Sequence, residues 1–422
     1  MRPDRARAII MTSAAAMAAI GSTLYLASYF AGGLLALAAL AIFGFLRRSE
    51  LGAEGFAAAS RSMLKAAAVP AIGIASALAI GAAVMLATGY DPVASYAALF
   101  YGGLVRNWHI SVLNATPLIF TGLAISFGFK GGLFNIGAEG QYFVGVMAAT
   151  WLGLKLNLPA PLGVPLVFVV GMLAGAAANL IPAALKVKTG AHEVVTTMMM
   201  AYAIRTLSPM FIRANGGDPA SSAHPYATAQ IGERLWLPLF KDVLPASNYR
   251  LHVGVLVAVA AAFAVRFVLD RTDLGFKIRA VGHNPIAART QGISTARITF
   301  ATLLISGALA SMAGVTQVLG LDHRMFQNLN AGYGWNGISI ALLARNDPIA
   351  IVFAALLWGV LDAGGQYMAR TASTPNAIIE IVKSVILFLL LAEVVYSSSG
   401  AAIKRFLAGR KAARAASEGG RS

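Results

Sequence analysis

The chain contains little charge for its length and no cysteine. Only 12% of its 422 residues are charged, whereas 58% are hydrophobic, and soluble domains carry about 25% charged residues. The absence of cysteine excludes disulfides and thiolate chemistry, although it leaves the redox compartment undetermined. The low charge excludes an ordinary soluble protein and predicts a polytopic membrane protein with little room for a separate soluble domain.

Motifs for enzymatic chemistry are also missing. No G-x-x-x-x-G-K-[ST] loop occurs, so the chain has no sequence basis for binding ATP phosphates. No histidine and carboxylate grouping has metal-ligand spacing, and no nucleophile-base pair is evident. The isolated His192-Glu193 step is interpreted as a cap or an interface contact. We therefore predict that the chain is not an enzyme, has no catalytic residue and holds neither a metal nor a cofactor of its own.

Long apolar runs recur along the sequence. A bilayer core of about 30 Å requires roughly 20 helical residues, and runs of about this length predict an all-α fold with about 10–12 transmembrane helices. The expected spans are residues 9–29, 31–46, 66–87, 110–129, 133–153, 163–185, 192–212, 251–269, 297–320, 332–344, 349–369 and 377–396.

The positive charge is distributed unevenly. The formal net charge is +16, yet the basic residues gather in alternate short loops and in the tail, as the positive-inside rule describes for membrane insertion. This pattern predicts a multi-pass membrane protein with both termini in the cytoplasm and lipid, not nucleic acid, around it. The residues assigned to the cytoplasm include Arg47, Arg48, Arg61, Lys65, Lys130, Lys186, Lys188, Arg271, Lys277, Arg279, Arg289, Lys404, Arg405, Arg410 and Lys411.

Three regions follow from these patterns. Residues 1–65 are predicted to form an N-terminal helical extension, residues 66–396 the transmembrane domain and residues 397–422 a basic cytoplasmic tail. Three arginines precede the first apolar run, as in a secretory signal. Because many more spans follow, we interpret that run as a retained first helix.

One segment predicts a broken helix. The run 332–344, "GYGWNGISIALLA", is short for a crossing and opens with glycines, and "RNDP" closes it. Non-helical backbone at membrane depth is tolerated only where protein or a water-filled cavity surrounds it. The segments "GMLAGAAANLIPAALKVKTGAHEVVTTMMM" and "SGALASMAGVTQVLG" with "LNAGYGWNGISIALLA" are similar to each other and run in opposite directions in the predicted topology. They indicate an inverted repeat with a substrate path between its halves.

Polar residues also interrupt the apolar pattern at "GGLFNIGAEGQYFVGV". On a helix Asn135 and Glu139 share one face, and an unpaired charge at the centre of a membrane helix costs about 2.5–3.5 kcal/mol. Two interpretations remain open. Glu139 either bonds across a helix break, for instance near Asn336, or lines the translocation path together with Asn135 and Gln141. A nucleoside in that path would need a flat apolar surface, which Phe134 or Trp335 could provide.

The stretch 270–294 predicts a short helix in a polar loop. Asn284 suits the N-cap, Pro285 the first helical position and Gly292 the C-terminal closure. A helix of about two turns is too short to be stable alone, so we expect it to be held against something. A solvated connection and a docking element are both compatible with the sequence.

Several motifs together carry a resemblance. "GLFNIGAEGQ", "TGAHEV", "AVGHNPIAARTQGIS", "SGALASMAG" and "GYGWNGISIALLARNDP", in this order, resemble permease subunits of bacterial ABC importers for nucleosides and simple sugars, in the branched-chain amino acid and ribose permease superfamily. The resemblance covers roughly residues 66–396. It implies a type II importer-like fold, a location in the bacterial inner membrane and three partners. The partners are a cytoplasmic subunit that binds and uses ATP, a second homologous permease and an extracytoplasmic substrate-binding protein.

The resemblance also assigns an ATPase-coupling segment. "IAARTQG" is similar to the importer signature of Glu-Ala-Ala, three residues and Gly, with Ile286 standing where that Glu would be. This departure keeps the short helix but places no charge at that position. The coupling residues implied are Gly282, His283, Asn284, Pro285, Ile286, Ala287, Ala288, Arg289 and Gly292.

The function expected is therefore a permease subunit that forms the path for a nucleoside, with a purine nucleoside favoured, or for a simple sugar. The candidate path residues are Phe134, Asn135, Glu139, Gln141, Trp335 and Asn336. The alternative is an ion-coupled secondary transporter, in which Glu139, Asp362 or the Glu380/Lys383 pair would bind ions. The i, i+3 spacing of Glu380 and Lys383 is explained more simply by an ion pair within one helix.

The loop 213–250 is either a plain connection or the face that receives a binding protein, and its "ERLWLPLF" could lie at the membrane interface with Trp236 as anchor. Homodimeric and heterodimeric pairing remain equally open.

Overall fold

A computed structural model of the protein describes residues 73–216, 226–240, 250–327, 329 and 332–389. The predictions for residues 1–65 and 397–422, including the first two spans, lie outside these residues. Within them the regular elements are helices, accompanied by isolated bridges such as Leu239–His252. The all-α prediction is confirmed.

The chain divides into two compact units, which we describe separately. The described part of the smaller unit consists of residues 73–96 and 372–389. It contains the helix Gly73–Ala87 and a helix over 377–389. In the latter, Lys383 Nζ lies 2.6 Å from Glu380 Oε1, so the ion pair expected within this helix is present.

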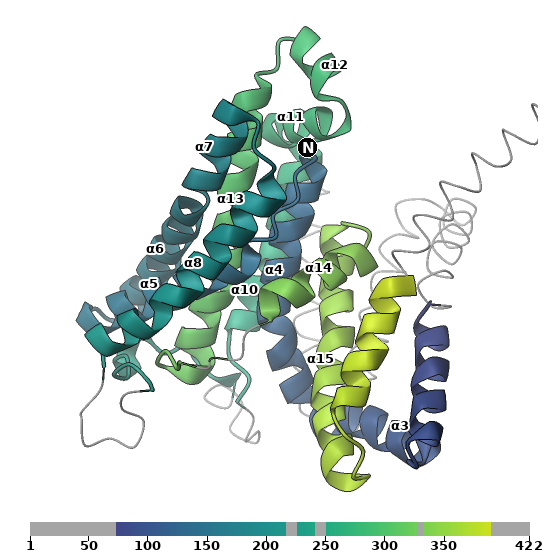
Figure 1. The fold of residues 1–422 in the computed structure, drawn as a ribbon. Coiled ribbons are helices and arrows are strands. Elements are labelled where there is room, and N and C mark those ends of the chain that lie inside the picture. The colour runs from purple at the N-terminus through teal and green to yellow at the C-terminus, as the bar shows by residue number, and fades with distance from the viewer. Residues whose placement is uncertain (1–72, 217–225, 241–249, 328, 330–331, 390–422) are drawn as a thin grey trace, which may run out of the picture. The chain divides into compact units, whose positions relative to one another are not determined.

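The described part of the larger unit lies within residues 97–371 and holds the candidate site. The helix α3 (Pro92–Phe100) enters it, and a π-helical turn, η1 (Tyr101–Arg106), follows. The remaining helices are α4 (Trp108–Lys130), α5 (Ala138–Lys155), α6 (Ala160–Ala178), α7 (Leu180–Thr189), α8 (Glu193–Ala214), α10 (Gly254–Arg271), α11 (Asp273–His283), α12 (Pro285–Thr290), α13 (Thr295–Gln317), α14 (Tyr333–Leu343) and α15 (Pro348–Thr371), with short turns at η2 (Glu233–Leu235) and η3 (Val318–Asp322) (Figure 1).

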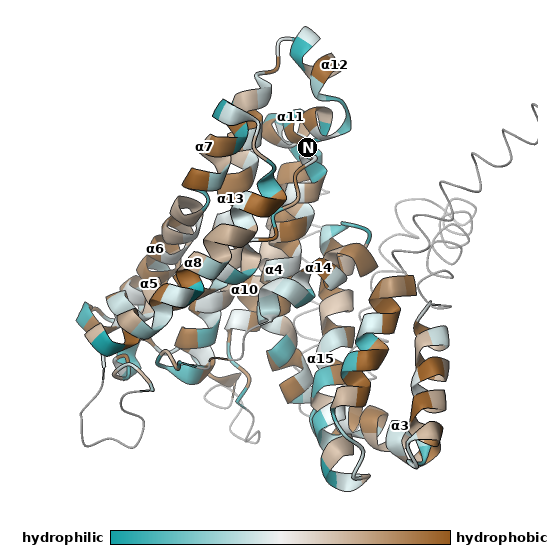
Figure 2. Ribbon diagram, in the orientation of Figure 1, coloured by the Kyte–Doolittle hydropathy of each residue, from teal (hydrophilic) through white to brown (hydrophobic). Residues whose placement is uncertain are grey.

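Four helical segments in the described part are both long and apolar enough to cross a membrane: Trp108–Lys130, Ala160–Thr189, Thr295–Asp322 and Pro348–Thr371. Figure 2 shows hydrophobic residues along these helices and more hydrophilic ones at the α11–α12 end. The helix α8 has 22 residues but is not among the four. Its lower apolarity indicates that α8 is not surrounded by lipid on all its exposed sides.

Glycines bring α13 close to its neighbours. Gly175 of α6 and Gly307 of α13 each approach the other's carbonyl oxygen so closely that neither position has room for a side chain. Such small-residue contacts let membrane helices associate where lipid offers no hydrophobic drive. Gly171 faces Val315 while Gly175 faces Ser311, so α6 and α13 run antiparallel. This is the relative direction that the predicted inverted repeat requires.

Several predicted spans agree with the helices, two need correction, and the helices α3 and α11 were not predicted. The short segment 332–344 is the helix Tyr333–Leu343, as predicted. The span 133–153 was placed too early, because α5 begins only at Ala138. The span 163–185 is two helices, α6 and α7, that meet at Asn179. At each of these two points a buried amide side chain, Asn135 or Asn179, donates a hydrogen bond to α13.

The loop after α8 packs into the protein. Leu235 and Leu237 are buried, and the Trp236 ring stacks on His323 with 3.8 Å between ring centroids. The proposed interfacial anchor, Trp236, therefore packs on a protein side chain.

Candidate functional site

A buried network of amides surrounds the loop between α4 and α5. Asn135 Nδ2 donates to Gln141 Oε1 at 2.9 Å and to Ser306 Oγ at 2.8 Å. Gln141 Nε2 in turn donates to Asn179 Oδ1 at 2.6 Å, and Asn179 Nδ2 donates to the Leu303 carbonyl oxygen at 2.7 Å. All four polar side chains are at most 2% exposed. Satisfied networks of this kind rigidify a core, and this one joins α5, α6 and α13.

The sequence prediction that Asn135 and Glu139 share a helix face is wrong. Asn135 lies before α5, and its Oδ1 accepts from the Gly137 N–H at 3.0 Å. This local bond offers the backbone an alternative to the helix. The preceding Gly132 has φ +71°, a conformation that disfavours any residue with a side chain. Together these residues delay the start of α5.

Glu139 contacts the segment 332–344, which the sequence predicts to be broken. Its Oε1 accepts from the Gly332 N–H and its Oε2 from the Gly334 N–H, each at 2.8 Å. These donors lie at the N-terminus of α14, where backbone N–H groups have no partner within the helix and favour negative charge. Gly334 approaches the Glu139 backbone so closely that no side chain fits there. The carboxylate on α5 therefore holds the start of α14 in place.

Glu193 makes a similar contact to the loop between α4 and α5. Its carboxylate lies 2.7 Å from Lys186 Nζ and accepts from the Phe134 backbone N–H. The His192-Glu193 step is thus an interface contact, as interpreted from the sequence. The Phe134 ring stacks on Phe129 at 4.8 Å, so it packs on the helix that precedes its own loop.

Trp335 and Asn336 occupy the first turn of α14 and are partly exposed. The Trp335 ring lies 6.5 Å from the Tyr202 ring of α8, tilted by 43°. Of the six candidate path residues, Trp335, Asn336 and Phe134 have accessible surface, whereas Asn135, Glu139 and Gln141 are enclosed and bonded to protein groups.

The short helix α12 forms as expected. Asn284 Oδ1 accepts from the Ile286 and Ala287 N–H groups, both at 3.0 Å. At the other end Gly292 has φ +79°, and the Ile293 N–H donates to the Ala288 carbonyl oxygen at 3.0 Å. This is a Schellman-type closure. Figure 1 shows α12 at the top of the view, beyond α11.

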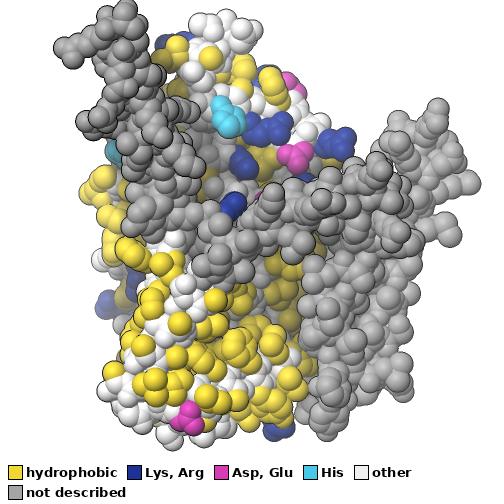
Figure 3. Space-filling view, turned by 90° about the vertical axis from the view of Figure 1, so that its right-hand side faces the viewer, with side chains coloured by type: hydrophobic (Ala, Val, Ile, Leu, Met, Phe, Trp, Pro, Cys, Tyr) yellow, Lys and Arg dark blue, Asp and Glu magenta, His cyan; other side chains and the backbone are white. Residues whose placement is uncertain are grey.

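The two faces of α12 differ sharply in exposure. The Ile286 side chain is 77% exposed, whereas Ala288 is 4% exposed. His283, Asn284, Pro285, Ala287 and Arg289 are exposed as well. Ala287 and Ala288 are identical residues side by side in the sequence, so only the fold shows that Ala288 faces inward. Figure 3 shows Lys and Arg side chains near this end.

Gly282, at the end of α11, contacts the loop that carries Asn135. A side chain there would collide with the Lys130 carbonyl oxygen and with the backbone of Gly131 and Gly132. The end of α11 and the loop between α4 and α5 therefore touch backbone to backbone.

We expect Gly292→Val to impair the closure of α12, because a β-branched residue is strained at positive φ. Space is not the limit, since a side chain at Gly292 would meet nothing within 4 Å. The strain costs about 1–2 kcal/mol. ATP-driven uptake should fall several-fold, whereas Gly292→Asn, which tolerates this conformation, should stay close to wild type. Equal activity of the two variants would contradict the closure.

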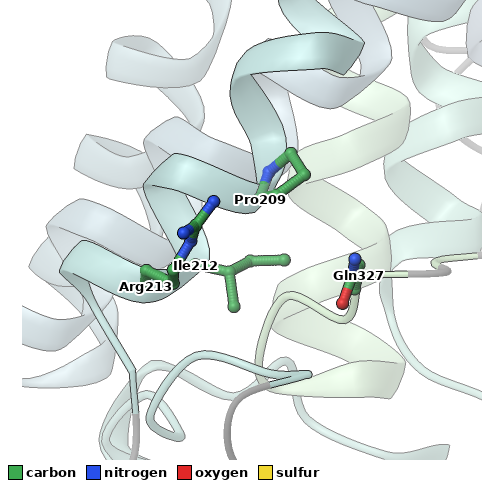
Figure 4. Close-up of a pocket in the computed structure, with 4 residues that line it drawn as sticks. All are labelled: Pro209, Ile212, Arg213 and Gln327. Atoms are coloured by element: carbon green, nitrogen blue, oxygen red, sulfur yellow. The ribbon is translucent and has the colours of Figure 1, made fainter.

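A pocket that sequence reasoning missed lies at the C-terminal end of α8. Its volume is about 240 Å³, and Pro209, Ile212, Arg213 and Gln327 line it (Figure 4). Figure 4 shows three of these residues on one helix and Gln327 opposite them. Pro209 and Arg213 stand four residues apart and share a face of α8, and the charge of Arg213 at the end of an apolar run is the signal that could have marked this face. In the described residues no group of three or more His, Cys, Asp or Glu side chains could hold a metal ion.

This combination of apolar helices, broken segments and a short exposed helix defines a membrane permease. The chain belongs to the family described as the branched-chain amino acid transport system permease component, whose family model matches residues 108–392. It is a multi-pass membrane protein and the permease subunit of an ABC importer, a transport component rather than an enzyme.

Curated relatives cover most of the chain. A glucose ABC transporter permease protein of Haloferax volcanii is 35% identical over 77% of this chain and 87% of its own length. A guanosine ABC transporter permease protein of Bacillus subtilis is 35% identical over 76% of this chain and 91% of its own. A nucleoside ABC transporter permease protein of Lactococcus lactis is 33% identical over 76% and 90%. No solved structure matches the chain significantly.

Proposed function

We propose that this permease forms the import path for a nucleoside, with a purine nucleoside favoured, or for a simple sugar. Relatives whose names specify guanosine, nucleosides and glucose support this substrate class at 33–35% identity. The observation that carries the importer mechanism is α12, a capped six-residue helix whose outer residue Ile286 is 77% exposed.

The energy comes from a separate ATP-binding subunit in the cytoplasm. Ile286 places an apolar side chain where the importer signature has Glu, so contact with the ATPase relies on shape and apolar burial at this position. Full burial of an isoleucine contributes about 1.5–3 kcal/mol. The inner side of α12 is fixed on the permease by Ala288, so a push on Ile286 displaces α11 and α12 together.

The assembly contains a second permease and an extracytoplasmic binding protein. Bacillus subtilis has a second guanosine ABC transporter permease protein, which is 25% identical to this chain over 275 residues. The existence of two such relatives in one organism favours a heterodimer of homologous permeases. The binding protein docks on the face opposite α12. This face is extracytoplasmic when both termini lie in the cytoplasm.

The proposal is tested by uptake into vesicles that contain the permease, its partner subunits and ATP, without an ion gradient. Guanosine or glucose should accumulate in an ATP-dependent manner. Accumulation driven by an ion gradient in the permease alone would overturn the importer mechanism.

Ile286→Asp should uncouple this system. A carboxylate at a contact that relies on apolar burial loses the transfer free energy and adds desolvation, so uptake should fall at least tenfold while the permease still inserts. Arg297→Ala serves as the control, because Arg297 is exposed at the start of α13, outside the coupling residues, and the variant should lose less than threefold. If Ile286→Asp transports normally, α12 is a solvated connection and not the coupling element.

A further inference from the structure

One side only of α8 is buried. Thr197, Ala201, Ser208 and Ile212 are buried, and Ala201 lies directly against Gly140 of α5. The rest of the helix surface is exposed over most of its length. A membrane-length helix with so narrow a packed stripe must present its remaining surface to lipid, to water or to another protein.

The exposed surface divides into two halves. Residues with a helical spacing of three or four share a face. Met199, Ala203, Leu207 and Met210 form an apolar half, which suits lipid. The other half, here called polar, carries Tyr202, Arg205, Thr206 and Arg213, with Pro209 among them.

Arg205 lies too deep in α8 for this polar half to face lipid. It stands 12 residues after Glu193 and nine before Ala214, which places it about 18 Å along the helix at 1.5 Å per residue. An arginine at the centre of a membrane helix costs about 2.5–3.5 kcal/mol when it faces lipid, and such residues normally face a cavity or a partner. Arg205 is exposed, so water or a partner must meet it.

The surroundings of Arg205 are suited to a small solute. Its guanidinium carbon lies 5.6 Å from the centroid of the buried Phe143 ring, which orients the group through a cation–π contact. Tyr202, 55% exposed, lies beside Trp335. The pocket lined by Pro209 and Arg213 follows on the same face, at four and eight residues from Arg205. Donors, flat rings and a cavity thus lie along a single line on α8.

We propose that this polar half of α8 lines the water-filled pathway and contacts the transported solute. Arg205 donates hydrogen bonds to acceptors on the solute, and Tyr202 with Trp335 offers a flat apolar surface. The ligand chemistry is a neutral molecule with one apolar ring face and several oxygen or nitrogen acceptors. A nucleoside and a sugar both have this chemistry. The inference rests on the proposed function for the identity of the solute, but water exposure of α8 can be tested without it.

The absence of cysteine provides a clean test of exposure. Single variants Tyr202→Cys and Thr206→Cys on the polar half, and Leu207→Cys on the apolar half, are reacted with a charged, membrane-impermeant thiol reagent in the assembled complex. We expect the first two to react and Leu207→Cys, at a position in lipid, to react at least tenfold more slowly. Saturating guanosine or glucose should slow the reaction of Tyr202→Cys. If Tyr202→Cys is protected in the assembled complex without solute and reactive only in the isolated permease, the second permease covers this face and the proposal fails.

Transport by Arg205 variants tests the contact with the solute. Arg205→Gln should lower maximal uptake at least tenfold at saturating binding protein, and Arg205→Lys should restore only part of it because lysine lacks the planar fork. Leu207→Ala is the control on the same helix and should transport normally. Dissociation of the two permeases in Arg205→Gln would assign Arg205 to a subunit interface, and normal uptake would remove it from the pathway.

Variants of the two aromatic residues distinguish a nucleoside from a sugar as the solute. Tyr202→Leu and Trp335→Leu should reduce uptake of guanosine more than of glucose if a nucleobase stacks there, since base–aromatic stacking contributes about 1–3 kcal/mol. A wild-type complex that imports neither solute would refute the proposed function, yet thiol labelling would still decide the exposure of α8. Import by the wild type with unchanged import by every α8 variant would refute only the present inference.

Discussion

Glu139→Gln is expected to lower ATP-driven uptake at least tenfold while expression and assembly remain near normal. The two carboxylate oxygens accept from the Gly332 and Gly334 N–H groups at 2.8 Å each. Glutamine has a single acceptor oxygen, so its amide nitrogen would face one of these donors. A lost hydrogen bond to a charged group costs about 1.5–3 kcal/mol, and each 1.4 kcal/mol changes an equilibrium tenfold. The N-terminus of α14 should therefore leave its position in a large fraction of molecules.

Glu233→Gln is the matched control, because it is the same substitution at an exposed turn. Uptake and assembly should be measured in parallel for both variants. Loss of assembly together with uptake would assign Glu139 to the stability of the fold, and unchanged uptake would show that the bonds to α14 do not matter for transport.

Gly282→Ala is the second change with a large expected effect. Even a methyl group at this position collides with the Lys130 carbonyl oxygen and with the backbone of Gly131. The end of α11 must then move away from the loop between α4 and α5, which also carries Asn135. We expect uptake to fall at least tenfold, with ATP hydrolysis by the complex less affected, because the coupling helix is displaced from the part of the permease that it must move.

Gly232→Ala provides the comparison. A side chain there would meet nothing within 4 Å and its backbone is not in the left-handed region, so uptake should stay within twofold of wild type. A Gly282→Ala protein that transports normally would show that the contact between α11 and the loop is dispensable.

The sequence by itself determined the class of fold and the short helix α12, whereas the neighbouring helix α11 was not predicted. Long apolar runs leave helices as the available backbone solution in lipid, and the structure has helices there. The caps of α12 depend on residues adjacent in the chain, Asn284 and Gly292, so local rules were sufficient to place them. The short helix α14 was predicted for the same reason, since its glycine-rich start and the closing "RNDP", where Arg345 and Asn346 have positive φ, are local signals. Asp347 Oδ1 accepts from the Ile349 and Ala350 N–H groups at the start of α15.

The tertiary structure alone decided which residues act together. Asn135 was placed on a helix because its neighbours look helical, but its bonds to Gln141 and Ser306 hold it in a loop. Glu139 meets the backbone of Gly332 and Gly334, nearly two hundred residues away in the chain. Arg205 was overlooked because the sequence records neither its exposure nor its position beside Phe143. Local patterns fix hydrogen bonds between neighbours in the chain, whereas the partners of a buried carboxylate and the exposed side of a helix depend on which distant helices pack around them.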